Sequence, residues 1–198
     1  MPGRTAVERG RDVRLRLLSA AATLVAEIGW NAVSTRTLAD RAGVTPGLVH
    51  YHFPSLQGLL RDATLGMVSD LLSSAEALFE NAQTLDAGVD LMLSSFDAST
   101  GSEATSLLFT ETYLAATRDE TLRSELVAVV GEFRQQLARW LAEHGADTSD
   151  VTASVLMAVI DGVILHRALN PALTASAVAP LLRRLIIPET GARLSMEQ

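Results

Sequence analysis

The chain has 198 residues, of which 48% are apolar, and its formal net charge is −7 at neutral pH. This length can bury the core of one large or two small domains, and the apolar fraction excludes a disordered polar chain. Cysteine is absent, which excludes disulfides and thiolate metal sites and indicates a reducing compartment.

The charge is distributed unevenly along the chain. Residues 1–62 contain eight Arg and five acidic residues, a balance of +3, whereas residues 63–198 contain eight Arg and eighteen acidic residues. Five of the arginines lie within residues 4–16. A basic end on an acidic body is expected of a protein that meets phosphate at one end only. A solvated basic helix start is the plainer alternative.

An apolar, Ala-rich stretch at residues 17–26 follows these arginines, as it would in a signal peptide. Glu27 interrupts it, and apolar residues recur at helical spacing from Leu17 to Ile28, which indicates the buried face of a helix. No uncharged apolar stretch approaches the ~20 residues that span a bilayer. We therefore expect a soluble, cytoplasmic protein with no membrane partner.

Strand signals are nearly absent, whereas apolar residues recur at i, i+3 and i+4 along the whole chain. The sequence therefore predicts an all-α fold. The helices are expected at about residues 11–28, 35–42, 46–53, 56–81, 84–98, 103–117, 120–143, 149–169 and 174–187.

Turn and cap residues mark the ends of the first four helices. Gly29 can end the first helix in a left-handed conformation, and Ser34 is a good N-cap for the second. Thr45 is expected to cap the third helix, with Pro46 at its first position. Pro54 ends that helix, and the serine that follows caps the long fourth one.

Residues 34–53 read STRTLADRAGVTPGLVHYHF, the outline of a helix-turn-helix. This geometry places one end of the second helix in a DNA groove. We expect His50, Tyr51 and His52 to face outward or toward the DNA backbone, and Phe53 to face inward. The residues spaced to pack the two helices together are Leu38, Ala39, Ala42, Val44, Leu48 and Val49.

The helix expected at 149–169 is apolar almost all round, broken by Asp161 and Gly162. Such a helix must be covered on every side, and in a chain this small one cover could be a second copy. The next helix adds another apolar stripe, so we expect a four-helix dimer interface. Its predicted residues are Val155, Val159, Val163, Val178, Leu181, Leu182 and Leu185.

The chain resembles the TetR family of one-component transcriptional regulators. The resemblance lies in Thr35–Ala39, in the Ala42–Val44 turn and in Thr45–Phe53, and the pattern Glu27–Trp30 that ends the first helix also fits. It covers about residues 10–65 in detail. Farther along, the length, the helical character and the pattern from Leu107 to Leu122 match.

This resemblance implies an N-terminal three-helix DNA-binding domain at residues 10–56 and a C-terminal helical domain for effector binding and dimerisation at residues 57–198. It also implies a ligand-responsive regulator, expected to be a repressor. Such a regulator would bind a near-palindromic double-stranded DNA operator as a homodimer and be released by a small apolar or amphipathic effector.

The resemblance also implies roles for individual residues. Arg36 would reach a guanine edge or a phosphate, and Thr45 and Gly47 would approach the groove. Tyr51 and His52 would contact phosphate, which positions the protein, whereas contacts to base edges specify the site. The predicted DNA-binding residues are Thr35, Arg36, Thr45, Pro46, Gly47, His50, Tyr51 and His52.

Two features depart from the family pattern. Many members carry a Lys just inside the fourth helix, where this chain has Leu56 and, indeed, no Lys anywhere. Arginines of the N-terminal arm are therefore expected to supply the phosphate charge. His50 stands where Tyr is frequent, which changes the expected base preference.

The family binds its effector among the fourth to eighth helices, where the aromatic and methionine residues of this chain concentrate. Apolar pockets with a few polar groups hold such ligands, although the same residues could simply fill a helical core. The predicted ligand-binding residues are Met67, Phe79, Met92, Phe96, Phe109, Glu111, Tyr113, Trp140, Met157, Asp161 and His166.

Catalysis is not expected, because the chain has no Cys, no Gly-rich phosphate loop and no His-Glu metal motif. His50 and His52 lie two apart on a helix and do not share a face, so they are poor metal partners. We expect no metal site and no cofactor. The alternative function is a helical ligand carrier or interaction protein that does not bind DNA.

Overall fold

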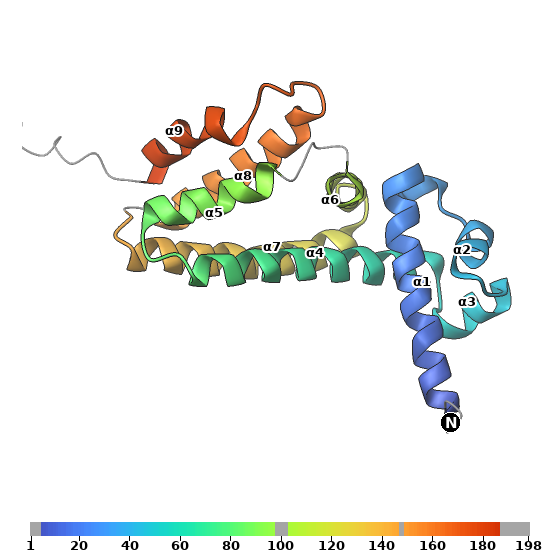
Figure 1. Cartoon of the computed structure of the whole chain (residues 1–198). Helices are drawn as coiled ribbons and strands as arrows, with labels where there is room; N and C mark the ends of the chain where they lie inside the picture. Colours follow the sequence, from blue (N-terminus) through green and yellow to red (C-terminus); the bar gives the residue numbers. More distant parts are fainter. Residues whose placement is uncertain (1–4, 98–102, 147–148, 187–198) are drawn as a thin grey trace, which may run out of the picture. The chain divides into compact units, whose positions relative to one another are not determined.

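The computed structural model describes residues 5–97, 103–146 and 149–186. Within them the chain forms only helices, which confirms the predicted all-α fold (Figure 1). The elements are α1 (Ala6–Ile28), the 3-10 turn η1 (Trp30–Ala32), α2 (Thr35–Ala42), α3 (Pro46–His52), α4 (Leu56–Glu80), α5 (Leu85–Asp97), α6 (Ala104–Ala116), α7 (Glu120–Glu143), α8 (Ser149–Arg167) and α9 (Ala175–Ile186).

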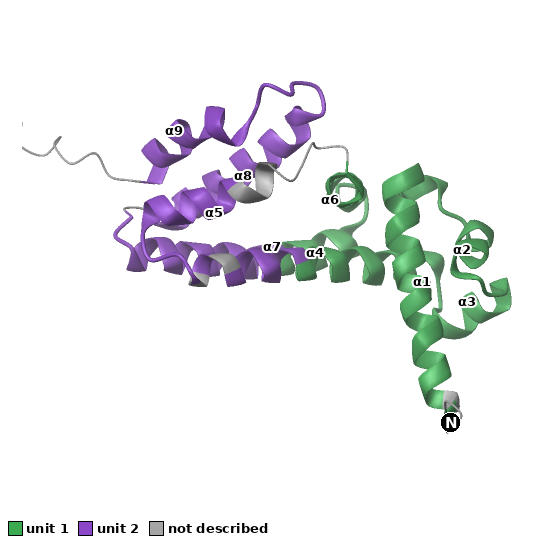
Figure 2. Cartoon of the chain, in the orientation of Figure 1, with its two compact units in different colours: residues 1–70, 103–129 green, residues 71–102, 130–198 purple. Residues whose placement is uncertain are grey.

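The chain divides into two compact units (Figure 2). Unit 1 contains residues 1–70 and 103–129, and unit 2 contains residues 71–102 and 130–198. The helices α4 and α7 each run from one unit into the other. The predicted boundary at residue 56 stays a prediction; helix α6, which follows it in sequence, belongs to unit 1 and packs against α1 and η1.

The core of unit 1 is built on α1. Leu17, Ala21 and Val25 recur at helical spacing and are fully buried, as expected of one apolar face. This helix packs against α2 and also against α6. It begins at Ala6, five residues before the expected start, because Thr5 forms a capping box with Glu8.

The left-handed cap expected at Gly29 does not form there, since Gly29 has φ 82° and ψ 155°, but one forms at Gly43 in the turn between α2 and α3. Gly43 adopts the left-handed conformation, with φ 64° and ψ 40°, and its N–H donates to the carbonyl of Ala39. The N–H of Val44 also donates to Ala39, at 3.0 Å. These bonds satisfy carbonyls at the end of α2, which is how a glycine after a helix normally ends it.

The predicted N-caps are confirmed at two of three positions. Ser34 shares a capping box with Thr37, and Ser55 Oγ accepts the N–H of Gly58 at 3.0 Å. Thr45 stands at the N-cap of α3, but its side chain makes no cap hydrogen bond. Leu48, expected in the core, is 39% exposed because α3 turns it away from α1 and α2.

Unit 2 has its own apolar core, made by α5, α7, α8 and α9 together with Phe79 near the end of α4. Leu141, Leu156 and Leu182 are almost completely buried in it. On its surface, Arg183 of α9 forms ion pairs with two aspartates of α5, and these partners raise its pKa.

Helix α8 is long and apolar enough to cross a membrane by length and composition, and it is the one such helix among the residues that the structure describes. It carries Asp150, Asp161 and Arg167, so it is not an uncharged stretch. Only Ala153 and Leu156 of this helix are fully buried within the chain. Several of its other apolar residues are half-buried against the core of unit 2, and Val155 and Leu165 are exposed.

Two glycines inside helices give opposite predictions for stability. A Cβ at Gly66 in α4 would meet no atom within 4 Å, whereas one at Gly88 in α5 would lie 2.3 Å from Cη2 of Trp140. Gly66→Ala should raise the free energy of unfolding by about 0.5–1 kcal/mol. Gly88→Ala should lower it by about 1–3 kcal/mol, because the new methyl overpacks the core. Urea unfolding checks both values, and a Gly88→Ala protein as stable as the wild type would contradict the packing described.

Candidate nucleic-acid interface

Helix α3 is packed on one side against the core of unit 1, and its other side is exposed to solvent. Val49 is 2% exposed and Phe53 is 3% exposed, so these two residues fix the helix to unit 1, as expected of Phe53. Tyr51, between them in sequence, is 81% exposed. The short helix therefore offers its polar face to solvent and its apolar face to the core.

Most predicted DNA-binding residues lie on this exposed surface. Those that are exposed are Arg36, Thr45, Pro46, Gly47, His50 and Tyr51, while Thr35 and His52 are half-buried. The Thr45 hydroxyl makes no cap bond, and Arg36 makes no side-chain hydrogen bond or ion pair with the described residues. Both groups are therefore available to a ligand outside the chain.

Arg14 lies within α1 and makes contacts around the helix-turn-helix formed by α2 and α3, which we call the head. Its guanidinium lies 4.2 Å from the centre of the Phe53 ring, and Nη2 pairs with Asp62 at 2.8 Å. Nη1 also donates to the carbonyl of His52 at 3.3 Å. The expectation that the arm arginines serve phosphate therefore has to be corrected for Arg14. Its partners lie 38 and 48 residues away, and no local pattern announces them.

The other arginines of α1 fall into two groups, those with a partner inside the chain and those without one. Arg16 donates to the carbonyl of Ala42 at 3.3 Å, at the end of α2. Arg9 and Arg11 make no side-chain hydrogen bond or ion pair among the described residues. These two, with Arg36, are the arginines of the first three helices that lack a partner there, since Arg41 forms a two-bond pair with Glu27. The Arg41 hydrogen bond lowers the pKa of that carboxyl.

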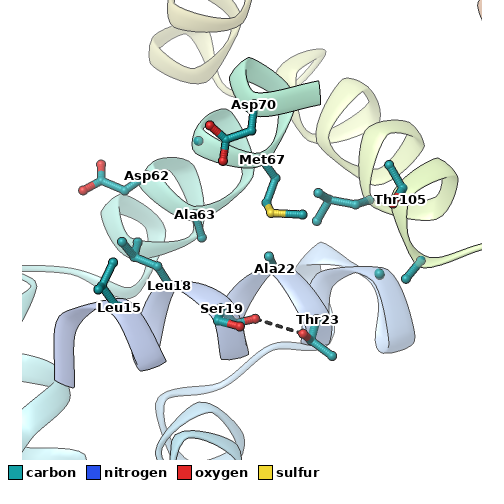
Figure 3. A pocket seen from close by; sticks show the side chains of 14 residues that line it. Leu15, Leu18, Ser19, Ala22, Thr23, Asp62, Ala63, Met67, Asp70 and Thr105 are labelled. Carbon is teal, nitrogen blue, oxygen red and sulfur yellow. Dashed lines mark hydrogen bonds between the residues drawn. The ribbon is translucent and has the colours of Figure 1, made fainter. Parts of the chain in front are cut away.

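The predicted effector residues are divided between the units. In unit 1, Tyr113 is 61% exposed, Phe109 is half-buried, and the Glu111 carboxylate accepts the main-chain N–H of Trp30 at 3.0 Å. The Met67 side chain lines a groove of about 340 Å³ between α1, α4 and α6 (Figure 3). Ala and Gly residues leave this groove unfilled, and two aspartates of α4 are its charged lining residues.

In unit 2, four predicted effector residues share one apolar cluster: Phe79, Met92, Trp140 and Met157. The Trp140 ring lies 5.6 Å from Phe79 and stacks on His144 at 4.3 Å. Its indole Nε1 is buried and has no hydrogen-bond partner in the described part of the chain. A buried donor without a partner is costly, so this N–H is an exception in an otherwise satisfied core. The side chain of Phe96 lies outside the described residues.

Asp161 and His166 lie on the solvent side of α8. Although Asp161 is exposed, the apolar surface around it desolvates the carboxyl and raises its pKa to about 6. His144 follows the end of α7, and its Nδ1 lies 2.7 Å from the carbonyl of Trp140.

The predicted dimer residues do not share one environment. Val155, Leu181 and Leu185 are 42%, 54% and 48% exposed. Val178 and Leu182 are 6% and 0% exposed, so they fill the core of their own unit and the prediction is wrong for them. Leu181 and Leu185 lie beside this buried face, on the neighbouring side of α9. Val159 and Val163 pack, half-buried, against the same core.

Two family profiles match the chain. Residues 17–63 match the profile described as bacterial regulatory proteins of the tetR family, and residues 83–188 match the tetracyclin repressor-like C-terminal domain. The second profile alone covers more than half of the chain. The chain belongs to the TetR family. It is therefore a ligand-responsive transcriptional regulator with a helix-turn-helix, and not an enzyme.

Full-length relatives agree with this assignment. The TetR-family chain is 29% identical to the HTH-type transcriptional repressor KstR2 of Rhodococcus jostii (strain RHA1), over 76% of this chain and 90% of the relative. It is 30% identical to the HTH-type transcriptional regulator BetI of Rhizobium meliloti (strain 1021), over 80% of this chain and 79% of the relative. The solved structure of a transcriptional regulator from Streptomyces coelicolor A3(2) matches this chain with a TM-score of 0.72 at 27% identity. The match covers 89% of this chain and 99% of that structure.

Arg14 and Arg11 should behave differently when replaced in this TetR-family protein. Arg14→Ala should lower the free energy of unfolding by about 1–2 kcal/mol, since it removes a cation–π contact and an exposed ion pair. Arg11→Ala should leave stability unchanged, because its exposed side chain has no such contacts. Thermal unfolding of the two variants makes the comparison. Equal stability of both would show that Arg14 does not brace the head.

Proposed function

We propose that this TetR-family regulator is a cytoplasmic repressor. It binds a near-palindromic operator as a homodimer and is released by a small apolar or amphipathic effector. The exposed face of α3, held in place by the buried Val49 and Phe53, is the observation that carries the proposal. The name of one relative, a transcriptional repressor at 29% identity, supports the direction of regulation.

The charges and polar groups of the head support distinct roles in DNA binding. Arg36, at the start of α2 and without a partner among the described residues, can form the two-bond contact that specifies guanine. Tyr51 and the half-buried His52, whose rings meet edge to face at 5.1 Å, are suited to phosphate. Arg9 and Arg11 add positive charge that follows the DNA backbone.

The exposed surface of α8 supports a dimer. An apolar stripe with steps of three and four residues follows one face of this helix, as in a helix–helix seam. Its members are Val151, Val155, Ala158, Gly162 and Leu165, and the exposed Leu169 follows the end of α8 at Arg167. The small Ala158 and Gly162 allow two such helices to approach closely. We assign a second copy of this chain to the stripe, with Leu181 and Leu185 of α9 at its side.

The cluster around Trp140 supports an effector site in unit 2. Phe79, Met92 and Met157 supply apolar surface, and the buried indole N–H supplies a donor that lacks a partner among the described residues. An apolar or amphipathic effector with a carbonyl or carboxylate oxygen would satisfy both. An unrelated apolar molecule without an acceptor would leave the indole unpaired.

Release of DNA requires only modest coupling. Effector and DNA sites in such regulators are typically coupled by ~1–3 kcal/mol, and the effector must bind the non-operator conformation better than the other. The helix α4 belongs to both units and directly follows the head, so it is a continuous covalent link for this coupling.

The rival function, a helical carrier that does not bind DNA, gives a different salt response. Phosphate binding releases counterions, so operator affinity should fall by orders of magnitude between about 50 and about 200 mM salt. A gel-shift titration with the DNA upstream of the chain's own gene tests this. Absence of duplex binding at the lowest salt would favour the carrier.

Arg36 and Tyr51 should contribute differently to operator binding. Arg36→Ala should cost about 1–3 kcal/mol on the operator and relax the preference among variant sites. Tyr51→Ala should weaken binding to all duplexes alike, because it removes a phosphate contact. Affinity measured on the operator and on single-base variants separates the two. Identical profiles for both proteins would contradict this division of roles.

Leu185→Arg should produce monomers of 21.1 kDa with poor operator affinity, because the charge would be buried without a partner in the dimer seam. Val127→Arg is the matched control, since Val127 is 63% exposed on α7 and lies outside the proposed seam. Light scattering gives the mass of each. A Leu185→Arg protein with the dimer mass of the control would rule out this seam.

A further inference from the structure

Trp30, in the turn between α1 and α2, is tied to two other helices of unit 1. Its main-chain N–H donates to Oε2 of Glu111 on α6, at 3.0 Å. Its indole N–H donates to the side-chain oxygen of Gln57 on α4, also at 3.0 Å. The residue is only 6% exposed. One buried tryptophan thus links the end of α1 to α4 and to α6.

The Glu111 carboxylate also lies directly against the backbone of this turn. Gly29 has φ +82°, a conformation that other residues rarely adopt, and a Cβ placed there would lie 3.3 Å from Oε2 of Glu111. The carboxyl carbon would be 3.6 Å away. The missing side chain of Gly29 therefore lets α6 approach the main chain itself.

Glu111 has no ion-pair partner among the described residues, and the N–H of Trp30 is its recorded hydrogen-bond donor. A bond between an amide and a charged carboxylate is about twice as strong as one between neutral groups. The half-buried carboxylate therefore makes its hydrogen bond to the main chain of the turn, and it forms no ion pair with a charged side chain of the described residues.

The turn leads directly into the head. After η1 the chain reaches Ser34, the N-cap of α2, and α2 carries Arg36 and leads through Gly43 to α3. Helix α6 belongs to the C-terminal family profile by sequence, yet it packs in the same unit as the head. Within that profile, helix α6 supplies the carboxylate that accepts a hydrogen bond from the turn between α1 and α2.

We propose that Glu111 is a positioning residue for operator binding. Its bond to Trp30 fixes the start of α2, so a movement of α6 changes the presentation of α2 and α3 to DNA. This inference rests on the proposed function for its link to DNA, while the bond itself can be tested without DNA.

The DNA test compares Glu111→Leu with Glu125→Gln. Glu125 lies on α7 of the same unit, pairs with Arg61 at 3.6 Å on the surface, and its replacement changes the net charge equally. The two DNAs are a duplex selected by the wild-type protein from a random pool and an unrelated duplex. Glu111→Leu should bind the selected duplex about tenfold more weakly than the control, the scale of a lost charged hydrogen bond. It should bind the unrelated duplex equally well.

Glu111→Gln keeps an acceptor oxygen and should recover part of the loss. The proposal is overturned if Glu111→Leu binds the selected duplex within twofold of Glu125→Gln. It is also overturned if both duplexes are lost to the same degree, since a general loss of folding would do that.

Amide hydrogen exchange tests the bond in the DNA-free protein. In Glu111→Leu, residues 35–52 should exchange faster than in Glu125→Gln, with residues 11–28 unchanged. Equal exchange, or acceleration of both segments, would overturn the proposal. If Glu111→Leu fails to fold by circular dichroism, Glu111→Ala, which also removes the acceptor, replaces it in both comparisons. If the wild-type protein prefers no duplex, the proposed function fails, and the exchange comparison alone decides the role of Glu111.

Discussion

The buried face of α1 is the constraint on which unit 1 depends. Leu17, Ala21 and Val25 are fully removed from solvent, and the same helix packs against α2 on one side of its surface and against α6 on another. Burial of such a stripe supplies most of the stability of a helix this long, because helices depend on packing more than on intrinsic propensity. The head and α6 therefore share one support.

Polar groups then decide how this apolar frame can be used. Arg14 and Arg16 hold the ends of α3 and α2, and Arg41 pairs with α1, so these charges maintain the head. Arg36 makes no such internal contact among the described residues, and together with the exposed face of α3 it forms the surface that we propose binds DNA. The same sorting applies in unit 2, where Trp140 keeps a buried donor unpaired amid otherwise apolar surface.

The helices and the helix-turn-helix were predictable because their signals are local. The spacing of apolar residues marks each helix, Ser34 caps the start of α2, and Gly43 marks its end. Pairings between distant residues were not predictable: no pattern joins Arg14 to Asp62 or Glu111 to Trp30. The interface prediction failed for Val178 and Leu182 because one apolar stripe on α9 does not tell which side faces its own core and which faces a partner. The early start of α1 was missed although Thr5 and Glu8 have the capping-box spacing.

The central claim is that the face formed by α2 and α3 binds duplex DNA. The most direct test is to titrate the protein with a duplex at low salt and follow its amide NMR signals. The account predicts that the largest shifts fall within residues 35–52, with smaller ones in the arginine arm before Leu17. Binding that shifts other surfaces and leaves 35–52 unmoved, or no shift at any residue, would contradict it.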